Sequence, residues 1–152
     1  TVDEESGYIR FAGPWKEGVQ IVLSFPMAVN RVTAHHLVKS NRGRAAMQRG
    51  PLIYCLEQCD QAVPLSSIVV PSETKFEAQH DLGLLGGVTT LTGPGMEAAL
   101  PEWDADLYQR MLPTKPVIVK AVPYYAWDNR EPGAMEVWVR TCAQNCEAVA
   151  SD

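Results

Sequence analysis

The sequence has no apolar run near the roughly 20 residues that a membrane-spanning helix requires, so we expect no membrane insertion. Positive charge is not in excess: 13 lysine and arginine residues stand against 18 aspartate and glutamate residues, a net charge of −5. Binding to nucleic acid or to an anionic membrane is therefore not expected. The N-terminal TVDEESGYIR is acidic and lacks an apolar segment, so it predicts no signal peptide and slightly favours the cytoplasm.

The strong local signatures of catalysis and phosphate binding are also missing: G-x-G-x-x-G, Walker A, H-E-x-x-H and G-x-S-x-G. Four cysteines form the pairs Cys55/Cys59 and Cys142/Cys146, whose C-x3-C spacing differs from that of common zinc knuckles. We interpret them as reduced, structural thiols. A metal site and, in an exported protein, disulfides are the alternatives. Cys55 lies in an apolar run, where burial would raise its pKa and disfavour a nucleophile.

What the sequence does contain is turn residues and short apolar patterns. Eleven glycines and eleven prolines recur at short intervals, which favours strands and turns over helices. Residues 19–25, VQIVLSF, place every second apolar side chain on one face, as in a half-buried strand. Residues 51–56, PLIYCL, are continuously apolar, which is typical of a strand buried on both faces. Residues 117–121 and 135–139 alternate as well and predict a hairpin.

These patterns predict an all-β fold of one domain, the usual size for 152 residues. About eight short strands, without the long crossover helices of a parallel sheet, indicate an antiparallel β-sandwich of jelly-roll-like form. A long irregular loop is expected around residues 93–114. The domain would span residues 1–141, and a weakly ordered tail would follow over residues 142–152.

The segment PYYAWDNREPG is the best candidate for ligand contact. Tyr124 and Trp127 could stack on a sugar ring, while Asn129 and Arg130 could donate hydrogen bonds to its hydroxyl groups. The alternative, which we favour, is a packed tyrosine–tryptophan pair followed by a polar turn.

Three longer segments carry a family resemblance: GYIRFAGPWKEGVQIVLSFPM, NRGRAAMQRGPLIYCLE and AVPYYAWDNREPGAMEVWVR. Together they resemble the C-terminal region of a bacterial glycoside hydrolase family, family 127-like and formerly a domain of unknown function. This family contains the retaining β-L-arabinofuranosidases. The segments occur here in the family order and at about the family spacing.

The resemblance implies that this chain does no chemistry itself. In the family a cysteine of a Cys-Cys pair and a zinc ion act in an upstream (α/α)6 barrel, and this sequence has no Cys-Cys pair. We therefore expect no catalytic residue and no cofactor here, with zinc only in the barrel. The chain would be an accessory domain, and Arg42, Arg44 and Arg49 would brace loops or dock onto that barrel.

Two further expectations follow from the family. Family members have strands upstream of the GY dipeptide, so we expect the first strands of the sandwich to be missing and self-association through the open sheet edge. The alternatives to an accessory domain are an independent carbohydrate-binding module that uses Trp127, Tyr124 and Asn129, and a dimerisation domain.

Overall fold

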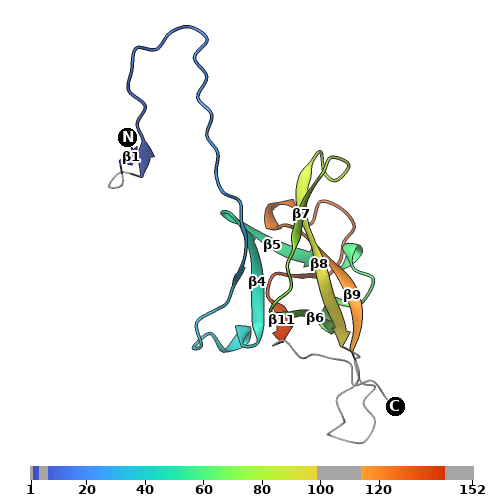
Figure 1. The fold of residues 1–152 in the computed structure, drawn as a ribbon. Coiled ribbons are helices and arrows are strands. Elements are labelled where there is room, and N and C mark those ends of the chain that lie inside the picture. The colour runs from blue at the N-terminus through green and yellow to red at the C-terminus, as the bar shows by residue number, and fades with distance from the viewer. Residues whose placement is uncertain (1, 4–6, 99–113, 143–152) are drawn as a thin grey trace, which may run out of the picture.

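The computed structural model describes residues 2–3, 7–98 and 114–142. Figure 1 shows a compact barrel and a long N-terminal segment that extends away from it. The strands are β1 (Val2–Asp3), β2 (Tyr8–Ile9), β3 (Val29–Val32), β4 (Arg44–Arg49), β5 (Leu52–Glu57), β6 (Ile68–Pro71), β7 (Glu77–Asp81), β8 (Val88–Ala98), β9 (Thr114–Pro123), β10 (Met135–Glu136) and β11 (Val139–Cys142). Four 3-10 turns join them: η1 (Lys39–Asn41), η2 (Gln58–Asp60), η3 (Leu65–Ser67) and η4 (Tyr124–Ala126).

Six strands close into a barrel in the order β4–β5–β9–β8–β6–β11, and β11 returns to β4. Neighbours are antiparallel except β11 and β6, which run parallel. The fold is all-β as predicted, but the predicted sandwich is wrong. A sandwich keeps two separate sheets, whereas the pairing of β4 with both β5 and β11 makes one sheet that closes on itself.

The barrel interior holds the hydrophobic core. Its fully buried side chains come from every part of the ring, and they include Tyr54, Leu56, Ile68, Leu91, Val119 and Val139. The Tyr54 hydroxyl donates to the Thr89 carbonyl over 3.0 Å, which satisfies the polar end of a buried ring. The continuous apolar run of β5 is confirmed as a buried strand, since residues 54–57 are all buried.

The turn between β4 and β5 depends on Gly50. Its φ of +55° lies in the left-handed region that glycine adopts without steric cost. Its amide donates to the Ala28 carbonyl over 3.2 Å, and a Cβ at this position would collide with Met27 Sδ. Gly50 therefore lets the β4–β5 hairpin close tightly against the residues that precede β3.

Three local predictions need correction or fall outside the described residues. Residues 93–98 of the expected irregular loop belong to β8, which pairs with β9 from Gly93↔Val119 to Ala98↔Thr114. Residues 99–113 of that loop, and residues 143–152 of the expected tail, lie outside the described residues. The predicted hairpin is wrong, because β9 pairs with β5 and β8, whereas β10 pairs with β5 and β11 with β4 and β6.

The predicted strand over residues 19–25 does not form; in Figure 1 this stretch is part of the extended segment. The closed ring of six strands also has no open edge. Free edges among the described residues belong to the flanking strands β3, β7 and β10 and to the separate pair of β1 and β2, each of which has one neighbour. Self-association through an edge stays a prediction. None of the helical turns in the described ranges is long enough to cross a membrane.

Candidate functional site

The candidate sugar-contact segment forms a loop at the end of β9, residues 124–134. Pro123 ends the strand, and η4 follows with the Trp127 amide donating to the Tyr124 carbonyl over 3.2 Å. The loop then returns to β5, where the Gln58 amide donates to the Ala134 carbonyl over 3.0 Å and β10 adds to the sheet. The loop is thus anchored at both ends on the barrel.

A buried ion cluster fixes the middle of this loop. Arg130 donates from Nη1 to Asp60 Oδ1 over 2.9 Å and from Nη2 to Asp60 Oδ2 over 2.5 Å, and Nη2 also donates to Glu57 Oε2. Lys120 Nζ lies 3.4 Å from Asp60 Oδ1. The side chains of Glu57 and Asp60 are only 5% and 8% exposed. Such a fork-shaped contact is a strong charge-assisted pairing.

The opposite charges of this cluster stabilise the ionised form of Asp60 and Arg130. Burial alone would raise the pKa of Asp60, but hydrogen bonds from Arg130 and the nearby Lys120 charge outweigh burial and hold that pKa below its usual value. The hydrogen bond to Asp60 is the main reason why the pKa of Arg130 rises. Both groups are therefore charged at neutral pH. Glu57 Oε1 also accepts from the Asp128 amide over 3.3 Å.

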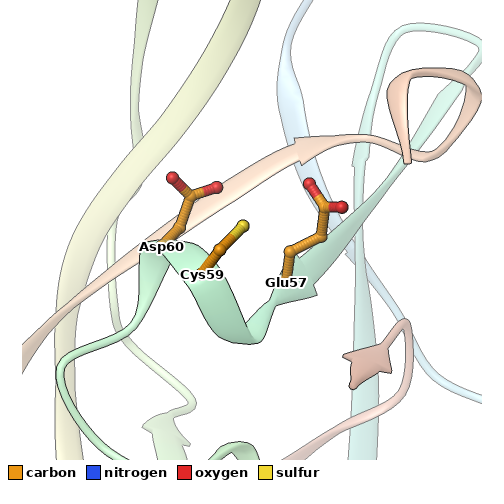
Figure 2. A group of neighbouring side chains, drawn as sticks. All are labelled: Glu57, Cys59 and Asp60. Atoms are coloured by element: carbon orange, nitrogen blue, oxygen red, sulfur yellow. The ribbon is translucent and has the colours of Figure 1, made fainter. Parts of the chain in front are cut away.

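The same region brings together three side chains of metal-ligand type. Figure 2 shows Glu57, Cys59 and Asp60 on η2 and the end of β5, pointing to the same side, with their ligand atoms within 4.8 Å of one another. A cation there would have to displace Arg130 from both carboxylates and Lys120 from Asp60. The donor set is already neutralised by protein cations, so it does not fit a metal ion.

The aromatic residues of the loop lie closer to the surface. The rings of Tyr124 and Trp127 stack with their centroids 6.0 Å apart and an interplanar angle of 22°. Tyr124 is 48% exposed. Asn129, by contrast, donates from Nδ2 to the carbonyls of Ala126 and Trp127 over 3.2 and 3.0 Å. Its amide nitrogen holds the turn, and Arg130 is engaged in the ion cluster.

The three candidate arginines of the β4 region, Arg42, Arg44 and Arg49, each contact different residues. Arg44 braces the start of β4: its Nη1 donates to the Trp138 carbonyl over 2.7 Å and lies 3.8 Å from Glu136 Oε2. Arg42 is exposed and makes long contacts, 3.4 Å, to the His36 carbonyl. Arg49 ends β4. Burial raises the pKa of the Tyr54 hydroxyl, and the positive charge of Arg49 opposes that rise. Docking by these residues stays a prediction.

The cysteines provide no activated thiol among the described residues. Burial is the main cause that raises the pKa of Cys55 to about 12, as expected for its apolar strand. The pKa of the exposed Cys59 is raised too. Both are free thiols, whereas Cys142 is disulfide-bonded, which corrects the interpretation of a reduced thiol at that position.

Sequence reasoning did not single out Glu57, Asp60 or Lys120, although they complete the cluster. Glu57 and Asp60 follow directly after the buried run in CLEQCD, and acidic residues at such a position need partners when they are buried. Arg130 is 73 and 70 residues away from them in the chain, so no local pattern identifies it as that partner.

The described residues thus form a closed all-β barrel, and their charged cluster holds one of the barrel's own loops in place. The particular family follows from comparison. The profile of the glycoside hydrolase family 127 C-terminal domain matches residues 29–140, so the chain belongs to this family.

Known relatives agree with this assignment. The non-reducing end β-L-arabinofuranosidase of Bifidobacterium longum subsp. longum is 35% identical in an alignment 144 residues long, which covers 90% of this chain and 22% of that protein. A crystal structure of a GH127 β-L-arabinofuranosidase from Geobacillus stearothermophilus T6 matches with a TM-score of 0.70 at 42% identity, over 78% of this chain and 19% of that chain. A GH127 β-arabinofuranosidase structure matches with a TM-score of 0.66 at 31% identity, over 78% and 18%. The chain spans about a fifth of the length of these relatives.

Proposed function

We propose that this chain is the C-terminal accessory barrel of a glycoside hydrolase that cleaves β-L-arabinofuranosides, and that the catalytic residues lie in another part of the same polypeptide. The family match over residues 29–140 carries this proposal, since the relatives are β-L-arabinofuranosidases four to five times as long. In this proposal zinc belongs to the catalytic part, as the family resemblance implies. The pairing of the Glu57 and Asp60 carboxylates with Arg130 supports the absence of a zinc site at these residues.

The accessory role is one of support. Arg44 and Arg130 make their contacts within the barrel, whereas Tyr124 of the 124–134 loop presents an exposed ring. A rigid surface of this kind suits docking onto a catalytic domain in the same polypeptide. The catalytic part is therefore the expected partner, and the exposed ring of Tyr124 is a candidate contact.

The test is hydrolysis of an aryl β-L-arabinofuranoside by two purified proteins, the longer gene product and the 152-residue chain. We expect turnover only by the longer protein. Circular dichroism of the chain serves as the folding control. Turnover by the chain alone, or no turnover of any β-L-arabinofuranoside by the longer protein, would contradict the proposal.

A second candidate function is sugar binding, favoured by the stacked pair of Tyr124 and Trp127. Calorimetric titration with arabino-oligosaccharides separates the two roles. Saturable binding that Trp127→Ala abolishes and Arg42→Ala leaves intact would make the chain a binding module. A dimerisation role, the third candidate, predicts a mass of two chains in light scattering.

A further inference from the structure

The N-terminal segment, residues 10–28, carries a row of apolar side chains that nothing in the described part of the chain covers. Residues 19–25 alternate as a strand would, yet the side chains of that face are between 49% and 68% exposed: Val19, Ile21, Leu23 and Phe25. Soluble proteins rarely leave a contiguous apolar row of this length in water. The row therefore requires a partner surface.

The backbone of residues 19–25 also lacks a partner. None of these residues pairs in a strand ladder within the described ranges. At the start of the stretch, the Val19 amide donates a hydrogen bond to the Lys16 carbonyl in a turn. The opposite face carries Gln20 and Ser24 beside Val22. One apolar face and free amides are the properties of a strand that adds to an existing sheet.

The comparisons place residues 19–25 ahead of the barrel domain, in a stretch that the relative shares. The C-terminal domain profile begins at Val29, so residues 19–25 lie outside the barrel domain. The alignment with the Bifidobacterium longum enzyme covers 90% of the chain and leaves out about 15 of 152 residues, so it includes residues 19–25 wherever it starts. The relative thus carries this stretch at the junction with its preceding part.

We propose that residues 19–25 form a β-strand in the domain that precedes the barrel in the same polypeptide, so that the segment is the last strand of that domain. The proposal rests on the proposed function, in which the chain is part of a longer glycoside hydrolase. Covalent linkage favours this partner over a second copy, because a tethered sheet is present at a high effective concentration. The strand would couple the barrel to the rest of the enzyme.

Hydrogen exchange of the longer gene product, read by mass spectrometry, tests this strand. We expect the amides of residues 19–25 to exchange at least 100-fold more slowly than unstructured peptide, with the same protection at low and at tenfold higher protein concentration. Exchange at the unstructured rate would overturn the proposal. Protection that disappears on dilution would also overturn it, because the partner would then be a second copy.

Matched variants assign the protection to the apolar face. Leu23→Asp should return residues 19–25 to fast exchange and leave the barrel amides of residues 54–56 protected, while Ser24→Asp on the opposite face should change neither. If Leu23→Asp also makes the barrel amides exchange fast, the milder variant Leu23→Ala is used instead. We then expect a smaller increase in exchange at residues 19–25. Equal effects of the substitutions at positions 23 and 24 would contradict burial of one face.

Activity toward an aryl β-L-arabinofuranoside, measured on the same preparation, separates the two proposals. An active enzyme with unprotected residues 19–25 contradicts only the strand assignment. An inactive protein with protected residues 19–25 contradicts only the proposed function.

Discussion

The barrel and the N-terminal segment both carry apolar patterns typical of strands, and the apolar side chains are buried in the barrel but exposed in the segment. Leu56 in β5 is 0% exposed, whereas Leu23 in the N-terminal segment is 54% exposed. The barrel strands have neighbours on both sides that pair their backbone and cover their apolar face, and residues 19–25 have neither. Alternation in a sequence thus specifies which face of a strand is apolar, while the partner sheet decides whether the strand forms.

The largest difference in the free energy of unfolding is expected between substitutions of a charged residue in the barrel and of one in the N-terminal segment. Arg130→Ala leaves the carboxylates of Glu57 and Asp60 buried without their guanidinium partner, and we expect a loss of about 3–5 kcal/mol in the free energy of unfolding. Lys16→Ala in the N-terminal segment is the control, with a change within about 0.5 kcal/mol. Urea unfolding measures both. Equal effects would show that the ion cluster does not hold the barrel.

The same substitution in the two regions separates their packing. Leu56→Ala removes a fully buried side chain from the barrel and should cost about 2–5 kcal/mol. Leu23→Ala should cost less than about 0.5 kcal/mol in the 152-residue chain, because its side chain is already exposed. Thermal unfolding followed by circular dichroism gives both values. A large loss for Leu23→Ala would mean that the segment packs on the barrel.

Two glycines test how tightly the N-terminal segment joins the barrel. Gly50→Ala should destabilise by about 1–3 kcal/mol, because it combines a left-handed φ with a collision against Met27. Gly43→Ala has a left-handed φ of +68° but open space around the new methyl group, so its cost should be smaller. Urea unfolding midpoints give the comparison, and an equal cost would exclude a role for the Met27 contact.

The smallest effect concerns acid stability. The pKa of Asp60 in the folded state lies below that of the unfolded chain, about 3.9. The stabilisation from its ion pair is therefore complete above about pH 4 and is lost as the pH falls through the folded-state pKa. Asp60→Asn should make the free energy of unfolding less dependent on pH between about 4 and 2. An unchanged slope would contradict the lowered pKa.

The sequence predicted the all-β class, the buried run of β5 and the family, because local periodicity and long motifs carry that information. It did not predict the barrel, since closure depends on the pairing of β4 with β11 and of β6 with β11, between segments far apart in the chain. Arg130 was one of the possible docking or sugar contacts, and that role stays a prediction. Its ion pairs join residues about 70 positions apart, which no local pattern indicates.

The closed barrel should resist unfolding as a unit that does not include the N-terminal segment. Limited trypsin digestion of the 152-residue chain tests it most directly. We expect rapid cleavage after Lys16 in the exposed segment and slow cleavage after Arg49 and Lys120 in the barrel strands β4 and β9, which leaves a resistant product. Cleavage at all three sites at the same rate would contradict the claim.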